Sequence, residues 1–463
     1  MSTRSRASGR SRPDQSAPRL LRGVYLTWVV VVVGVIACTL AGLSWGFQRN
    51  TNGLPTEVIQ LHVAITPTVA GTPATQAATA IPTAIPTAIQ APTVIAGPQE
   101  TGLPNQDTHF GYGIQTRLNV NTAATLDQLH ELGLSWVKFP VSWASIEPEP
   151  DQYQWADLDS EIGSAASSNL NVLITVSDAP NWARSVTARG KNGEPDNVQT
   201  YVKIIRVILG RYGDAIKAVE IWNDENTDDS WYGPGGINPA GYLNLLIPAA
   251  QAIRQANPGI LIVSGALTPT GRNDNISAVD DFVYMKGLID GKLLDYVDCV
   301  GAHHIGFNLP PTLSAEDAFA GGMPPGTVFA GPYDTSNPVN PHHSWSFFST
   351  LNGYHGMIVA AGKETPLCVT QFGWASAEGI GVPQPDFLFA RDNSPDEQAK
   401  YIVRAFRAMH DWGFVRMAVL YNLDYASKPA GAQPDEAGLF SILNTSGQPR
   451  PAYFAVRDMP KLP

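Results

Sequence analysis

Short apolar runs alternate with longer helical patterns from about residue 107 onward, and no other feature of the chain restricts the fold as strongly. This alternation is typical of parallel β/α architecture, in which each strand is followed by a helix that covers the sheet. We predict eight strands, the number found in a (β/α)8 barrel. They span His109–Ile114, Trp136–Val141, Asn171–Ser177, Ala218–Trp222, Ile260–Ala266, Cys299–His303, Leu367–Phe372 and Met417–Asn422.

Helical patterns separate these runs, for example at Ala123–Leu132, Val198–Tyr212, Pro239–Ala256 and Asp396–Trp412. The alternative fold is a doubly wound open sheet, which would place a Gly-rich phosphate loop after its first strand. The only candidate, Gly111-Tyr112-Gly113, lies inside the first strand. We therefore predict that residues 107–463 form one α/β domain, a (β/α)8 TIM barrel.

Residues 24–47 form an apolar, uncharged run that is long enough to cross a bilayer as a single helix. Six arginines lie in the basic tail 1–23, so the positive-inside rule predicts a cytoplasmic N-terminus and an extracellular barrel. A cleaved signal peptide would have a shorter apolar core. A lipoprotein site at Cys38 is a second alternative, but the apolar run continues beyond it. We favour an uncleaved signal anchor in the cell membrane.

A linker rich in Pro, Thr and Ala occupies residues 48–106. Its prolines favour extended, disordered conformations, in which thirty-odd residues span up to ~100 Å. The remainder of the chain is acidic, since the net charge is −11 although the tail is basic. An acidic domain is a poor partner for nucleic acid, whose phosphate backbone attracts cationic proteins.

Three cysteines do not form a disulfide framework. Cys299 and Cys368 are predicted on neighbouring strands and could pair, but two buried free thiols are the favoured interpretation. Neither cysteine has a His or Cys at metal-ligand spacing, so we predict no metal site. Nothing indicates an organic cofactor.

Two segments, Ile221–Asn226 and Val369–Trp374, each read as a buried strand that brings a polar side chain to its open end. In barrels of this kind the functional residues lie at the C-terminal ends of the strands. Aromatic and polar residues at such ends suit a sugar, which offers hydroxyls to hydrogen-bond and apolar ring faces to stack on. The candidates are Lys138, Trp143, Asp178, Asn223, Asp224, His303, Gln371, Trp374, Tyr421 and Asn422.

The two motifs resemble the catalytic strand ends of the clan-A glycoside hydrolases, which are retaining (β/α)8 barrels such as β-xylosidases and cellulases. Segments 143–159, 178–183 and 438–453 resemble further parts of these enzymes. The resemblance implies a carbohydrate as substrate or ligand. It places the general acid/base at Asp224 and the nucleophile at Gln371, where the family has glutamates in both positions.

Both substitutions affect the chemistry that the resemblance implies. Asp224 is one methylene shorter than Glu, and its reach is ~1.5 Å less, a misplacement that can cost ~100-fold in rate. Gln371 is neutral and cannot act as a carboxylate nucleophile. Glu225 follows Asp224, but strand neighbours point to opposite faces, so only a bulge would let it substitute. Lys138 replaces the family's Arg, and Tyr421 replaces its Trp.

Three functional hypotheses follow. The favoured one is a membrane-anchored glycan-binding pseudoenzyme with impaired retaining hydrolysis. The second is an active glycosidase with Asp224 or Glu225 as acid and another carboxylate as partner. The third is a structural adhesin, which predicts that loops 307–343 or 376–393 fill the groove. Carboxylates considered as the second catalytic group are Glu225, Asp178, Glu378 and Asp424.

Overall fold

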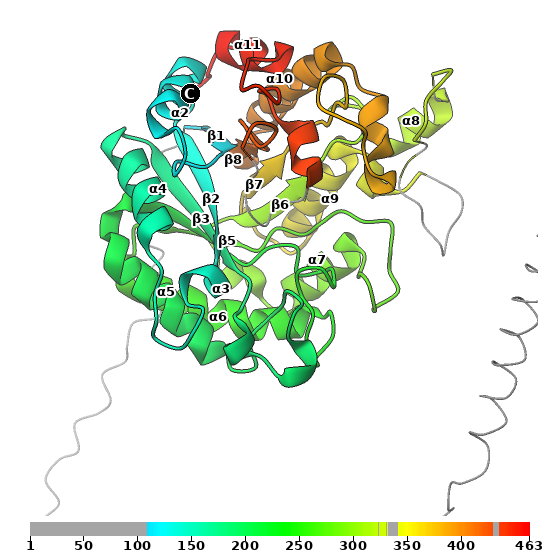
Figure 1. Ribbon diagram of the computed structural model, residues 1–463. Coiled ribbons are helices and arrows are strands. Elements are labelled where there is room, and N and C mark those ends of the chain that lie inside the picture. Colours follow the sequence, from blue (N-terminus) through cyan, green and yellow to red (C-terminus); the bar gives the residue numbers. More distant parts are fainter. Residues whose placement is uncertain (1–108, 323, 330, 332–340, 429–434) are drawn as a thin grey trace, which may run out of the picture. The chain divides into compact units, whose positions relative to one another are not determined.

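The computed structural model describes residues 109–463 apart from 323, 330, 332–340 and 429–434. Eight parallel strands run through this region in the order β5-β4-β3-β2-β1-β8-β7-β6 (Figure 1). Isolated parallel bridges, Val263 to Cys299 and Leu267 to Ala302, join the two ends of the sheet. The prediction of a (β/α)8 barrel is therefore confirmed.

The strands lie close to the predicted ranges. β3 and β7 have the predicted bounds, and the other six differ by one or two residues at one or both ends. The bounds are β1 Gly111–Gln115, β2 Trp136–Ser142, β3 Asn171–Ser177, β4 Ile216–Ile221, β5 Leu261–Ser264, β6 Val300–His304, β7 Leu367–Phe372 and β8 Val415–Leu420.

The helices surround the barrel and cover its outer face (Figure 1). Their starts follow from capping chemistry: Asn197 and Asn238 cap α5 and α6, and Ser394 forms a capping box with Glu397 at the start of α10. The bounds are α2 Thr122–Leu132, α3 Trp143–Ile146, α4 Ala156–Ser167, α5 Val198–Tyr212, α6 Pro239–Ala256, α7 Asp281–Asp290, α8 Ala315–Gly321, α9 Phe347–Ala360, α10 Pro395–Trp412 and α11 Pro451–Asp458.

The predicted membrane anchor and linker lie outside the described residues. Within 109–463, gaps aside, no helix combines the length and the apolar character that a membrane crossing needs.

The interior of the barrel contains a disulfide between Cys299 and Cys368, whose Cα atoms are 5.7 Å apart. The preference for free thiols was therefore wrong. Cys299 directly precedes β6 and Cys368 lies on β7, which pairs with β6. Both side chains face the interior, at a separation that matches the usual span of a disulfide. They pack there among Leu173, Ala218, Leu261, Val263, Met417 and Val419.

Candidate active site

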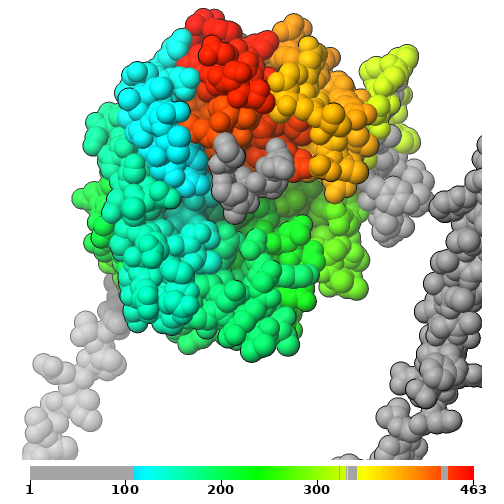
Figure 2. Space-filling model, viewed as in Figure 1, coloured from blue at the N-terminus to red at the C-terminus, as the bar shows by residue number. Residues whose placement is uncertain are grey.

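A cleft of about 1010 Å³ opens at the C-terminal ends of the strands. Figure 2 shows this face hollowed where the teal and green first half of the barrel meets the orange and red second half. Six of the predicted site residues line the cleft: Lys138, Asp178, Asn223, Asp224, Gln371 and Tyr421. None of the described residues of loops 307–343 and 376–393 is among the lining residues.

Asp224 enters the cleft because the chain turns sharply after β4. Trp222 and Asp224 both have positive φ angles, 69° and 54°, and the Asp224 amide donates to the carbonyl of Ala266 at 2.8 Å. Such angles are rare for residues other than glycine and often occur at functional sites. The turn ends the alternation of side chains between the two faces of the strand, and it leaves the Asp224 side chain 25% exposed.

Three donors surround the Asp224 carboxylate. His303 Nδ1 lies 2.9 Å from Oδ1, and Asn223 and Thr268 also donate to the carboxylate. Burial alone would raise the pKa of Asp224, but the charge of His303 and these hydrogen bonds outweigh it and lower the pKa. Asp224 is therefore an anion at neutral pH.

Glu225 lies behind the wall of the cleft and is fully buried. Among the described residues, neither of its carboxylate oxygens has a hydrogen-bond partner. Burial, reinforced by the charges of Asp224 and Glu220, raises its pKa well above the ordinary value. The turn after β4 therefore does not bring Glu225 into the cleft as a substitute for Asp224.

Gln371 reaches the cleft through an irregularity near the end of β7. The register with β8 shifts between Val369 and Phe372, and Gln371 lies opposite His303 of β6. The neighbouring Thr370 also faces the interior, where its hydroxyl donates to Glu220 Oε1 at 2.5 Å. Two consecutive side chains thus point inward, as a bulge permits.

Glu220 on β4 is a buried carboxylate that the sequence analysis did not identify. Lys138 Nζ lies 2.9 Å from its Oε2, Thr175 also donates to it, and His303 Nε2 lies 3.8 Å from its Oε1. Lys138 is therefore paired with Glu220. A single charge within the predicted strand Ala218–Trp222 was the available signal, because charged residues are rarely buried without a partner.

Asp178 follows β3 in a left-handed conformation, with φ 59°. Its carbonyl accepts from the amide of Ala144 at 2.9 Å, which ties the end of β3 to the start of α3. Burial raises the pKa of Asp178 by more than the bond from Ser142 and the charge of Arg184 lower it. Two carboxylates of one cleft thus have pKa values shifted in opposite directions.

Besides Glu225, three predicted site residues are fully buried and do not line the cleft. Trp143 donates to Glu147 Oε2 at 2.8 Å, and Trp374 donates to the carbonyl of Leu309 at 2.8 Å. Asn422 donates to the carbonyl of Ala437 at 2.8 Å. The polar atoms of these side chains are therefore bonded to neighbouring parts of the chain. His303 is also buried, and it reaches the site only through Asp224 and Glu220.

Known proteins resemble this chain in sequence over limited segments. A family model described as β-galactosidase matches residues 117–187. A probable glucan 1,3-beta-glucosidase A of Aspergillus fumigatus is 27% identical over 150 residues, which are 30% of this chain and 35% of that protein. The chain thus spans about a third of the length of this relative.

Solved structures extend the likeness over most of the barrel. A family 39 glycoside hydrolase from Bacteroides cellulosilyticus has a TM-score of 0.53 at 16% identity, covering 76% of this chain and 64% of its own. A monomeric β-xylosidase from Caulobacter crescentus has a TM-score of 0.50 at 15% identity, covering 76% of this chain and 68% of its own. At these identities the likeness establishes the fold. The chain is a (β/α)8 barrel that resembles the clan-A glycoside hydrolases in fold and, over residues 117–187, in sequence.

Proposed function

We propose that the chain is a glycan-binding protein of glycoside hydrolase descent in which retaining hydrolysis is impaired. One observation carries this proposal: Asp224 and Gln371 line one cleft, and the buried carboxylates around them do not replace the missing nucleophile. Retaining hydrolysis needs two carboxyl groups ~5–5.5 Å apart, one of which attacks the sugar. The amide of Gln371 can hydrogen-bond a sugar hydroxyl but cannot form the glycosyl-enzyme bond.

The nearby carboxylates have other roles. Glu220 is held by Lys138 and two threonines, and Glu225 lies behind the wall. Asp424 is paired with Lys428 at 2.6 Å. Glu378 is not among the described lining residues of the cleft. Of the four candidates for a second catalytic carboxylate, only Asp178 lines the cleft.

The environment of Asp224 also supports impaired hydrolysis. A general acid must carry a proton at the working pH, so active sites raise the pKa of that carboxyl group. Asp224 has the opposite shift, because His303, Asn223 and Thr268 stabilise its anion. The same arrangement suits recognition, since an anion and an amide at the floor of a cleft accept hydrogen bonds from sugar hydroxyls.

A second candidate function rests on the opposite pKa shifts of Asp178 and Asp224. Carboxylates whose environments separate their pKa values are the usual acid and base of a glycosidase. In this alternative the chain hydrolyses O-glycosidic bonds with Asp178 as the acid and Asp224 as the base. Inverting enzymes tolerate a carboxyl separation of ~6.5–9.5 Å.

We further propose that residues 24–47 anchor the chain in the cell membrane and that the linker holds the barrel outside the cell. The disulfide between Cys299 and Cys368 supports an extracytoplasmic barrel, because disulfides persist mainly in oxidising compartments. Labelling intact cells with a membrane-impermeant reagent tests this orientation. A barrel that reacts only after lysis would contradict it.

A hydrolysis screen on aryl β-glycosides, with the full-length chain and its Gln371→Glu variant, tests the main proposal. We expect turnover by the variant at least ~10³-fold above the natural chain, because the nucleophile is restored. Asn192→Asp is the matched control, since it makes the same amide-to-acid change at another exposed position of the cleft. Efficient hydrolysis by the natural chain, abolished in Asp178→Asn, would instead establish the second candidate.

A further inference from the structure

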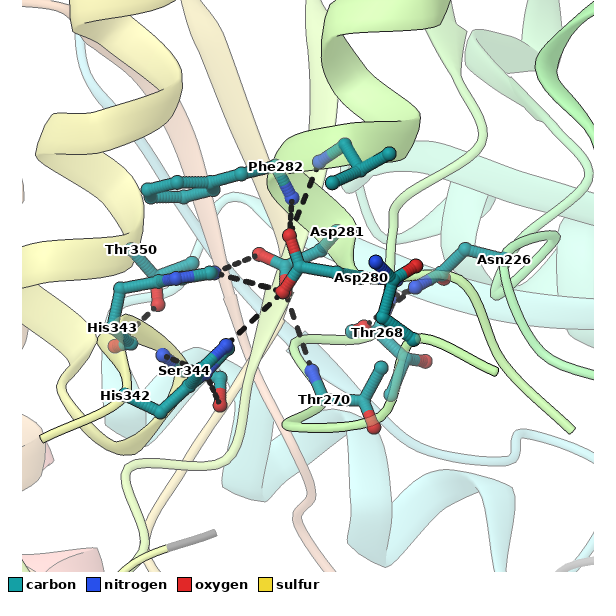
Figure 3. A network of polar contacts seen from close by, with 12 residues as sticks. Asn226, Thr268, Thr270, Asp280, Asp281, Phe282, His342, His343, Ser344 and Thr350 are labelled. Atoms are coloured by element: carbon teal, nitrogen blue, oxygen red, sulfur yellow. Dashed lines mark hydrogen bonds and ion pairs between the residues drawn. The ribbon is translucent and has the colours of Figure 1, made fainter. Parts of the chain in front are cut away.

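Two consecutive histidines and an aspartate converge outside the sugar cleft. Asp280 is the N-cap residue of α7, and His342 and His343 lie in the turn that starts the short helix His343–Trp345. Figure 3 shows the three side chains facing one another across the gap between these segments. Their ligand atoms all lie within 4.8 Å of one another. No other described residues form such a group of His, Cys, Asp or Glu.

The separations fit the coordination shell of one metal ion. Asp280 Oδ2 lies 3.2 Å from His342 Nε2 and 3.8 Å from His343 Nε2. A tetrahedral ion with bonds of 2.0–2.1 Å holds its ligand atoms about 3.3 Å apart. The two separations from Asp280 lie within about 0.5 Å of this value, and the third lies within 4.8 Å.

The Asp280 carboxylate is oriented for this role. Its Oδ1 accepts from the amides of Phe282 and Val283 at 3.0 and 3.1 Å, which leaves Oδ2 directed at the histidines. Oδ2 is buried and faces His342 Nε2 at 3.2 Å. A buried carboxylate is costly unless cations or hydrogen-bond donors compensate it.

Neighbouring groups hold both imidazoles. Ser344 Oγ lies 2.7 Å from His342 Nδ1, and the Ser344 amide donates to the same nitrogen at 3.3 Å, which orients the ring with Nε2 toward Asp280. The ring of Phe282 stacks on His343 at 3.5 Å. In His342 the second nitrogen is thus held by a neighbouring residue, as is characteristic of metal-binding histidines.

The charge of the cluster also suits a divalent ion. Asp281, which is fully buried, lies beside the site with Oδ1 3.0 Å from His343 Nε2, and Tyr354 donates to its Oδ2 at 2.8 Å. The two carboxylates supply the negative charge that one divalent cation balances. Nitrogen and oxygen donors in a small shell favour Zn²⁺ and similar ions over Ca²⁺ or Mg²⁺.

We propose that Asp280, His342 and His343 form a binding site for one divalent transition-metal ion of the Zn²⁺ class. The ion would tie the loop before α7 to the turn before α9. The amide of Thr270 in that loop lies 3.3 Å from Asp281 Oδ1, and Thr268 in the same loop donates to Asp224. The site would therefore anchor one wall of the cleft. The proposal does not depend on the proposed function.

The test is a Zn²⁺ titration of the full-length chain after treatment with a chelator, by calorimetry and by elemental analysis. We expect one ion per chain for the natural protein. Loss of a direct ligand in His343→Ala should weaken binding more than ~100-fold, and Ser344→Ala, which removes only the outer partner, should weaken it ~10-fold. His410→Ala is the matched control, because His410 is also paired with an aspartate, Asp411, but lies outside the cluster.

The variants must remain folded for this comparison, which near-UV circular dichroism checks. The melting temperature of the natural chain gives an independent readout: Zn²⁺ should raise it in proportion to ligand binding, and should not raise it for His343→Ala. Absence of saturable binding by the natural chain would overturn the proposal. Equal binding by His343→Ala and His410→Ala would also overturn it, and the cluster would then be a set of Asp–His ion pairs only.

Discussion

The barrel interior has a lower half, nearer the N-terminal ends of the strands, and an upper half, nearer their C-terminal ends. The same strands build both halves, but the two have opposite chemistry. Leu173, Ala218 and Cys368 belong to the apolar lower half, and the residues two positions further on are Thr175, Glu220 and Thr370. Side chains two residues apart on a strand face the same side. One inward face therefore changes from apolar to polar along its length, which separates the half that stabilises the barrel from the half that can bind a ligand.

The largest effect is expected from breaking the buried ion pair of the upper half. Glu220→Gln leaves the Lys138 ammonium buried without a counter-charge, which should cost about 3–5 kcal/mol of unfolding free energy. The double variant Lys138→Met/Glu220→Gln should recover most of this loss, because the uncompensated charge is gone. Urea denaturation measures each value. The coupling would be contradicted if the double variant lost as much unfolding free energy as Glu220→Gln and Lys138→Met lose together.

Removing the disulfide tests how much the lower half of the barrel interior contributes to stability. Replacing both Cys299 and Cys368 by Ala should lower the unfolding free energy by about 2–4 kcal/mol, because the bridge closes a loop of 69 residues in the unfolded chain. Denaturation of the natural chain with and without a reductant provides the control, since reduction should reproduce most of the loss. Identical curves in all three cases would show that the cysteines are not paired in the isolated protein.

Two adjacent histidines of β6 point to opposite faces of the barrel wall. His303 faces the polar interior, whereas His304 is buried outside the barrel against Phe307 and Phe347. Burial lowers the pKa of His304 to about 3. As the pH falls below ~6.5 the unfolded chain takes up a proton at this residue and the folded chain does not, so stability decreases.

The expected loss from His304 is ~2 kcal/mol between pH 6.5 and pH 5, at about 1.4 kcal/mol per pH unit. The variant His304→Gln should lose this component of the pH dependence, whatever its stability at neutral pH. Denaturation curves at the two pH values measure the difference in slope. An unchanged slope would mean that His304 does not stay neutral in the folded chain.

An exposed ion pair should give the smallest effect. Lys286 and Asp290 of α7 are 2.6 Å apart but 71% and 64% exposed. Lys286→Ala should change the unfolding free energy by no more than ~0.5 kcal/mol, and less in high salt. The difference between this loss and the loss at the pair of Lys138 and Glu220 measures how much burial adds to the effect of breaking an ion pair of similar separation. Equal losses at both pairs would contradict the distinction between surface and interior.

The strands and the site differ in how well the sequence predicts them. β3 and β7 were predicted to the residue because apolar runs and their polar flanks are local features. Asp224 and Gln371 were predicted to share a cleft because parallel strand ends meet at one face. Trp143, Trp374 and Asn422 were misplaced as ligand-facing residues. The direction of a side chain beyond a strand end depends on turns whose angles the alternation pattern does not encode.

Glu220 and the cluster of Asp280, His342 and His343 were missed for a related reason. A charge within an apolar stretch of a strand signals a buried partner, but the partners Lys138, Thr175 and Thr370 are supplied by three other strands. Asp280 is likewise far in the sequence from the consecutive pair His342 and His343. Such groups exist only once the chain has folded, because their members come from separate segments.

The sequence by itself determined the barrel, its order of strands and helices, and the position of Asp224 and Gln371 at strand ends. These properties depend on periodicity and on residues next to one another in the chain. Only the tertiary structure decided that Cys299 pairs with Cys368, that Lys138 is neutralised by Glu220, and that Glu225 lies behind the cleft wall. Each of these depends on distances between separate strands or on a turn with positive φ, which closure of the barrel and packing set.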